Sequence, residues 1–192
     1  MKKTTALILV LSLAAAAMAE EFLVQFDFDD GTKNPSSTAG NISSTAIGAW
    51  SAQFRDDPFV RDNQDCWQVR KASAGDNVAT FVLTIAAGCT LEITDFSYQL
   101  NGDNAGYTGF TVAYSTDGSS FTDIGSDPDV PEANNWHDHT ITPGSAITGL
   151  EGDVTIRMTA TCDAGYKYFE HDNVAVIGNV ILPSKATTII IQ

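Results

Sequence analysis

Basic side chains are scarce in this chain, which has 10 Lys and Arg against 24 Asp and Glu and a formal net charge of −14. Such an excess of negative charge repels phosphate backbones and anionic lipid headgroups. The composition therefore excludes nucleic acids and membrane surfaces as expected partners. It suits an extracellular protein, or one that collects divalent cations.

The sequence also lacks an apolar run long enough to cross a bilayer, which takes about 20 residues. The run over residues 6–16 is shorter, and it lies between Lys2-Lys3 and the small residues Ala17-Met18-Ala19. This is the pattern of a bacterial secretory signal peptide. We expect residues 1–19 to be that peptide and residues 20–192 to be an exported, single-domain mature chain.

Cysteine is rare, with three residues, Cys66, Cys89 and Cys162. None of them has the CxxC spacing of a zinc or redox site. An oxidising compartment permits one disulfide and one odd thiol. The sequence leaves the pairing open.

After residue 20 no segment has a sustained helical period. Apolar and polar residues instead alternate with period two in short runs, which is typical of strands that bury one face. The predicted strands are 22–29, 79–86, 89–100, a hairpin over 109–125, 153–161, 173–182 and 187–191. A turn at Gly88 separates 79–86 from 89–100, and Asp117-Gly118 forms the turn of the hairpin. In the first of them the pattern puts Phe22, Val24, Phe26 and Phe28 on one face. These runs, with long polar loops expected at 30–50 and 125–137, predict an all-β fold, an antiparallel β-sandwich.

Catalytic motifs are missing as well, since there is no G-x-S-x-G elbow and no glycine-rich phosphate loop. Carboxylate pairs do occur, as Asp27 with Asp29 and Glu170 with Asp172, and paired carboxylates can hydrolyse glycosidic bonds. However, Ala175 stands where the Glu-x-Asp-x-x-Glu pattern of laminarinase-like hydrolases needs its last glutamate. A glycoside hydrolase is therefore the least favoured function, and we name no catalytic residue.

The same carboxylates suggest a metal site. Asp27 and Asp29 project from one side of a strand about 7 Å apart, and Asp172 could join them if the first and last strands lie side by side. Ca²⁺ prefers such oxygen ligands; the alternative is that each carboxylate is simply solvated. His137 and His139 share one strand face with a spacing that can hold zinc or copper, although no third ligand is identifiable.

Aromatic residues offer a different chemistry. Sugar rings present apolar C–H faces that stack on exposed tryptophan or tyrosine. Trp50 and Trp136 lie in the predicted polar loops, where recognition side chains are often found, and Tyr107 precedes a predicted strand. We take these three as candidate ligand-binding residues; the alternative is that they belong to the core.

Several motifs follow one another in a familiar order: FDFDDGT (26–32), YSTDGSSFTDIG (114–125), VTIRMTA (154–160) and HDNVAVIG (171–178). Together they resemble the jelly-roll, galactose-binding-like β-sandwiches of secreted bacterial proteins. Those domains are similar to carbohydrate-binding modules, to discoidin-type domains and to extracellular domains that precede PEP-CTERM sorting tails, although no such tail follows residue 178 here. The resemblance implies a structural calcium on Asp27 or Asp29 and on Asp172. It also matches Arg157 to a recurring arginine, which we add to the candidate ligand-binding residues.

The sequence thus predicts a secreted, non-catalytic module that binds extracellular or cell-surface polysaccharide or glycoconjugate. The alternative is a structural or adhesive subunit of an extracellular matrix or surface layer. Such a subunit would self-associate through edge strands, for which the apolar run at 188–191 is suited. The sequence does not name the glycan or the oligomeric state.

Overall fold

The computed structural model describes residues 10–12, 19–51, 53–61, 64–71, 74–102, 107–128, 135–162, 167–183 and 186–188, and all their regular elements are β-strands. The strands are β1 (Val10–Ser12), β2 (Ala19–Phe26), β3 (Ser37–Thr38), β4 (Ile42–Ser44), β5 (Gln53–Arg61), β6 (Gln64–Lys71), β7 (Gly75–Ile85), β8 (Thr90–Gly102), β9 (Tyr107–Ser115), β10 (Thr122–Asp127), β11 (His137–Ile141), β12 (Ile147–Leu150), β13 (Asp153–Cys162), β14 (Lys167–Ile181) and β15 (Ala186–Thr188). No helix in these ranges is long and apolar enough to cross a membrane.

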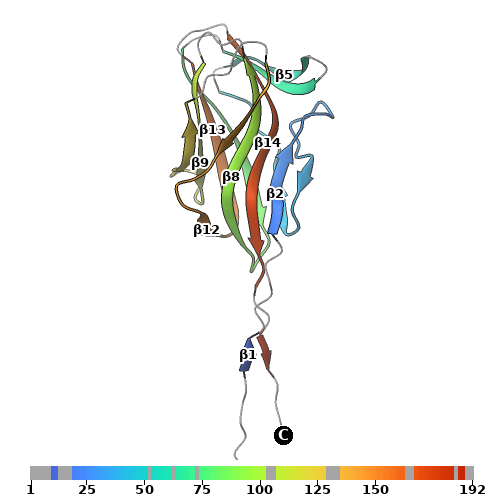
Figure 1. Cartoon of the computed structure of the whole chain (residues 1–192), viewed down its shortest axis with the longest axis vertical. Coiled ribbons are helices and arrows are strands. Elements are labelled where there is room, and N and C mark those ends of the chain that lie inside the picture. The colour runs from blue at the N-terminus through green and yellow to red at the C-terminus, as the bar shows by residue number, and fades with distance from the viewer. Residues whose placement is uncertain are drawn as a thin grey trace, which may run out of the picture.

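Two antiparallel sheets form the body of the molecule (Figure 1). The first has five strands in the order β10-β9-β13-β7-β4. The second has eight: β11-β8-β14-β2-β3 in one path, with β12 on β8, β6 on β14 and β5 on β6. The ladder of β1 and β15 lies beyond the end of β14 in Figure 1. The predicted antiparallel β-sandwich is confirmed.

The core lies between the two sheets. Phe26 of β2 meets Phe81 of β7 with ring centroids 5.0 Å apart, and Tyr98 of β8 meets Phe110 of β9 at 4.5 Å. Each pair joins one sheet to the other, and aromatic contacts of this kind add to the stability gained by burying the rings. On β13 every second residue is buried, as the period-two pattern predicts.

The first predicted strand is correct at one end and wrong at the other. Val24, Phe26 and Phe28 are buried as expected, but Phe22 is 39% exposed and Leu23 is buried instead. The reason is a register shift, because Val24 pairs with Val176 whereas Glu20 already pairs with Gly178. The extra residues on β2 form a bulge between Glu20 and Val24, and Phe22 lies within it, where the regular alternation of the strand is interrupted.

A second bulge lies on β14. Asp172 pairs with Gln99 and Ala175 with Ser97, so β14 advances by three residues over the stretch in which β8 advances by two. Asn173 sits in this bulge with φ of 47°, a left-handed conformation that asparagine tolerates better than most residues. The amide side chain of Asn173 consequently reaches the outer face of the eight-stranded sheet.

The other predicted elements are largely found. The turn at Gly88 joins β7 to β8, and the hairpin over 109–125 corresponds to β9 and β10. The loop expected at 30–50 contains the short strands β3 and β4. All three cysteines are buried, and Cys89 is a free thiol.

Candidate ligand groove

Trp50 is buried, with 3% of its surface exposed, so the prediction of an exposed recognition ring at this position is wrong. Residues 45–51 run along the edge of β7, where the amides of Thr45, Gly48 and Ser51 donate to carbonyls of that strand. The polar loop is therefore tied to the sheet, and its tryptophan turns into the sandwich. There the Trp50 indole stacks on the His171 imidazole, with ring centroids 5.3 Å apart.

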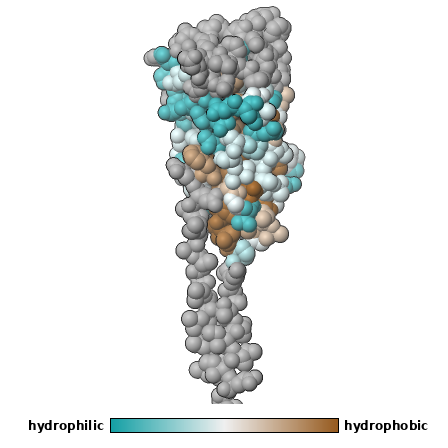
Figure 2. All heavy atoms as spheres, turned by 90° about the vertical axis from the view of Figure 1, so that its right-hand side faces the viewer, coloured by the Kyte–Doolittle hydropathy of each residue, from teal (hydrophilic) through white to brown (hydrophobic). Residues whose placement is uncertain are grey.

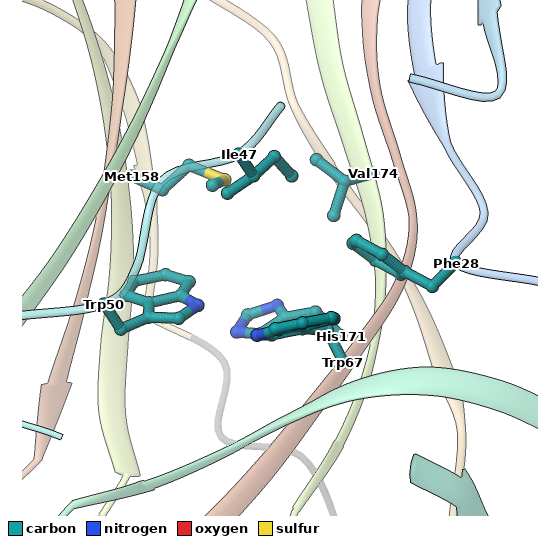
Figure 3. A pocket seen from close by; sticks show the side chains of 7 residues that line it. All are labelled: Phe28, Ile47, Trp50, Trp67, Met158, His171 and Val174. Atoms are coloured by element: carbon teal, nitrogen blue, oxygen red, sulfur yellow. The ribbon is translucent and has the colours of Figure 1, made fainter. Parts of the chain in front are cut away.

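Trp50 and His171 line a small closed space inside the sandwich, and Figure 3 shows their side chains with those of the other lining residues pointing toward one another. The other lining residues are Phe28, Ile47, Trp67, Met158 and Val174. The cavity measures about 10 Å³, the space of one water molecule at most. It is far too small for a sugar ring. Burial lowers the pKa of His171 to about 3, so this imidazole is neutral at physiological pH.

Of the remaining predicted ligand-binding residues, Trp136 and Arg157 lie in different parts of the fold. Trp136 is half-buried just before β11. Tyr107 begins β9, but its side chain lies outside the described part of the structure. Arg157 is on β13, where its guanidinium lies over the Phe121 ring at 4.0 Å. Arg157 therefore belongs to the outer face of the five-stranded sheet, away from the groove described below.

The predicted calcium ligands are also not gathered into one site. β2 and β14 do lie side by side, with Val174 opposite Phe26. However, the Asp172 carboxylate is buried and accepts from the backbone N–H of Asn173 at 2.7 Å and from its Nδ2 at 3.2 Å. Asp27 instead accepts from the backbone N–H of Asp29. Among the described residues no three His, Cys, Asp or Glu side chains are arranged to hold a metal ion, and calcium at these carboxylates stays a prediction of the sequence.

The two histidines of β11 have different surroundings. His139 Nδ1 lies 2.5 Å from Asp127 Oδ2, and its ring stacks on Tyr98 with centroids 5.0 Å apart. The Tyr98 hydroxyl donates to the same Asp127 oxygen at 3.1 Å. Since Asp127 ends β10, these contacts fasten the edge of one sheet to β8 and β11 of the other. They hold β11 in place; the zinc or copper site predicted for His137 and His139 finds no third ligand among the described residues.

A groove of about 290 Å³ crosses the outer face of the eight-stranded sheet. It is lined by Phe22 and Gln25 of β2, Ser97, Tyr98 and Gln99 of β8, Asn173 of β14, and Asp138, His139 and Thr140 of β11. Four adjacent strands thus contribute to one open surface. Period-two alternation explains the polar lining, because the outward positions of β8 carry Ser97 and Gln99 while its inward positions carry Phe96 and Tyr98.

Three amide side chains in the groove are joined in one direction. Gln25 Nε2 donates to Asn173 Oδ1 at 3.3 Å, Asn173 Nδ2 donates to Gln99 Oε1 at 3.1 Å, and Gln99 Nε2 donates to Asp138 Oδ1 at 2.7 Å. We call the three amides, together with the Asp138 carboxylate at which the series ends, the amide row. It runs across β2, β14, β8 and β11 in the order in which those strands lie in the sheet.

Phe22 supplies the apolar part of the groove. Together with Ile181 and Leu182 it is one of the large hydrophobic side chains exposed in the described ranges. These residues lie near the start of β2 and the end of β14, at the lower end of the sandwich in Figure 1, and Figure 2 shows apolar surface gathered at that end of the sandwich. Of the three, Phe22 borders the groove.

A second hollow, of about 380 Å³, lies at the edge of the sandwich. Its walls include Tyr114, Asp123 and Ile124 from the β9–β10 side, and residues 143–148 from the loop before β12 and the start of that strand. No row of joined amides comparable to that of the groove is found among its described lining residues. The groove is therefore the better-developed binding surface.

Sequence reasoning missed every residue of the amide row and Phe22. The signal that could have found part of it is the alternation of polar side chains with buried ones in 96–99. Phe22 and Asn173 carry no such signal, because two bulges determine which way their side chains point.

Comparison with known proteins gives the fold a context. No family model matches the chain, and a search of curated proteins finds no match. Solved structures do match, among them TmCBM61 in complex with β-1,4-galactotriose, at 8% identity and a TM-score of 0.50, over 79% of this chain and 94% of that one. Another is the CBM22-1 xylan-binding domain of Xyn10C from Paenibacillus barcinonensis, at 10% identity and a TM-score of 0.52, over 88% and 100%.

An arabinose-bound α-L-arabinofuranosidase, MgGH51, also matches at 10% identity and a TM-score of 0.50, over 85% of this chain but only 27% of the longer enzyme. At such low identity these likenesses concern the fold. The chain has the jelly-roll β-sandwich fold that carbohydrate-binding modules have, and some structures with this fold are parts of hydrolase chains.

Proposed function

We propose that this protein is a secreted, non-catalytic module that binds a polysaccharide or glycoconjugate in the groove on the outer face of its eight-stranded sheet. The observation that carries the proposal is the pairing of an exposed aromatic ring, Phe22, with the fixed amide row in one open surface. The likeness of the fold to that of a galactotriose-bound module and of a xylan-binding domain supports it.

This combination matches the chemistry of a sugar. One face of a pyranose ring is made of C–H groups that pack on an aromatic ring, while the hydroxyls at its rim need hydrogen-bond partners. Binding sites commonly join such an apolar wall to a small number of placed polar groups. Because the amides already hold one another, little side-chain entropy is lost when a ligand binds.

The groove does not favour hydrolysis. A glycosidase of the common kind needs two carboxyl groups on either side of the scissile bond, about 5 or 6.5–9.5 Å apart. Among the described lining residues Asp138 is the only carboxylate. Binding without catalysis is therefore the function that this surface supports best.

The test is affinity electrophoresis of the purified protein through gels that contain xylan, β-1,4-galactan or mixed-linkage β-glucan. We expect retardation by at least one of them, and about tenfold weaker binding for Phe22→Ala, which corresponds to about 1.4 kcal/mol. Ile181→Ala is the matched control, because Ile181 is also 39% exposed but does not line the groove.

Failure of every glycan to retard the protein would contradict the proposal. If the protein then sediments as oligomers, the structural or adhesive subunit becomes the better account. Equal losses in Phe22→Ala and Ile181→Ala would place binding somewhere other than the groove.

A further inference from the structure

We infer that Asp138 is the specificity-determining residue of this groove: it orients the amide row and makes the site select uncharged glycans over anionic ones. The inference rests on the proposed function, and it adds which class of glycan the groove accepts and which residue decides this.

The first step concerns direction. A side-chain amide carries two N–H donors on its nitrogen and an acceptor on its oxygen, so a row of amides could be joined in either sense. An ionised carboxylate only accepts. Asp138 therefore requires Gln99 to present its nitrogen, which leaves Gln99 Oε1 to face Asn173. The Asn173 oxygen in turn faces Gln25, so one carboxylate orients amides on three other strands.

A second carboxylate supports the same orientation. Asn173 Nδ2 also donates to Asp172 Oδ2, at 3.2 Å, so both hydrogens of this amide nitrogen are used by acceptors. Asp172 is 2% exposed, so this second acceptor is buried. The amide in the centre of the groove is thus held from two sides, and a ligand meets it already oriented.

The second step concerns charge. The described lining of the groove contains no Lys or Arg, and its one imidazole, His139, is paired with the Asp127 carboxylate. Asp138 is exposed, and Asp172 is buried next to Asn173. A uronate or sulfate entering this surface would face the Asp138 carboxylate within a protein of net charge −14, and the described lining offers it no Lys or Arg to pair with. Repulsion between unit charges about 4 Å apart amounts to about a fivefold loss of affinity where water screens them fully, and to a much larger loss where the protein surface reduces the screening. Because Asp138 is exposed, we expect about a tenfold loss, close to the water-screened limit.

The binding experiment uses matched probes. β-1,4-Galactan and mixed-linkage β-glucan are each compared with the same polymer after partial oxidation of its C6 hydroxyls to carboxylates, in low salt at pH 7.5. We expect the oxidised polymers to bind about tenfold more weakly than the native ones. Asp138→Asn, which keeps the shape and an acceptor oxygen but removes the charge, should narrow this difference in affinity between native and oxidised polymers severalfold. Thr140→Ala, on the same strand and also lining the groove, should leave the gap unchanged.

The outcomes are distinguishable. Equal binding of native and oxidised polymers by the natural protein would overturn the selectivity while leaving carbohydrate binding intact. A gap that Asp138→Asn leaves unchanged would overturn the role of Asp138. Binding of neither native polymer would count against the proposed function itself.

The orientation of the row is tested without any ligand. In ¹H–¹⁵N spectra of the free protein, Asp138→Ala should shift the side-chain NH₂ signals of Gln99, Asn173 and Gln25, with an effect that decreases along the row. Thr140→Ala should leave the Gln25 signal in place. If Asp138→Ala leaves the Asn173 and Gln25 signals where they were, the four residues do not act as a row.

Discussion

The buried imidazole of His171 predicts that the protein loses stability in mild acid. The ring is 2% exposed and is packed against Trp50 at 5.3 Å and Phe110 at 5.5 Å between centroids. Burial, and secondarily the charge of His139, lower the pKa of His171 from 6.5 to about 3 in the folded protein. The unfolded chain returns to about 6.5.

The sign follows from proton binding. Between pH 6.5 and about 3 the unfolded state binds a proton at His171 that the folded state does not, so lowering the pH favours unfolding. Each pH unit in this window is worth about 1.4 kcal/mol. Of the step from pH 7.5 to pH 5, about 1.5 units fall within the window, which gives a loss of about 2 kcal/mol from this one group.

The assay is urea denaturation followed by tryptophan fluorescence at pH 7.5 and pH 5. Other groups also titrate, so the comparison is between two proteins. The quantity of interest is the decrease in the free energy of unfolding from pH 7.5 to pH 5 in the natural protein, minus the same decrease in His171→Leu. We expect a difference of about 2 kcal/mol. Met158→Leu lines the same cavity but has nothing to titrate, so it should keep the full pH dependence. If His171→Leu and the natural protein lose the same stability, the imidazole is not held neutral by burial and the reasoning fails.

Three further predictions concern stability. An added Cβ at Gly178 would lie 1.9 Å from the carbonyl oxygen of Glu92, so Gly178→Ala should lower the free energy of unfolding by about 3 kcal/mol. The control is Gly144→Ala, where the added Cβ would have no neighbouring atom within 4 Å and the melting temperature should change little. Asn173→Ala and Asn173→Gly lose the same side-chain hydrogen bonds, but only alanine is strained at φ of 47°. The alanine variant should therefore be less stable than the glycine variant by about 1 kcal/mol in denaturant titrations. Equal stabilities of the two variants would argue against the left-handed bulge. Calcium stays a prediction of the sequence: a melting temperature several degrees lower in EGTA than in millimolar calcium would support it, and identical melting curves would refute it.

The fold could be predicted from the sequence because its strands bury one face. Val154, Ile156 and Met158 alternate with polar neighbours, and all three are buried as expected. Period two is a local property, so it is readable from a few consecutive residues. The same holds for the turn at Gly88 and for the hairpin turn at Gly118, where φ is positive in both cases.

The groove could not be predicted in the same way. Its residues come from four strands that are distant in the sequence, and the pairing of those strands is decided by the whole sandwich. The bulge in β2 exposes Phe22 against the alternation, and the bulge at Asn173 brings an amide to the outer face. Trp50 was misplaced for a related reason, since a segment that reads as a polar loop forms long-range hydrogen bonds to β7.

The central claim is that a glycan binds in the groove. The most direct test is a ¹H–¹⁵N titration of the natural protein with soluble fragments of a polysaccharide that retards it in the gel. The account predicts that the side-chain NH₂ signals of Gln25, Gln99 and Asn173 shift together with the backbone signals of 97–99 and 138–140. Shifts confined to the second hollow, at Tyr114 and 143–148, or no shifts at any fragment concentration, would contradict it.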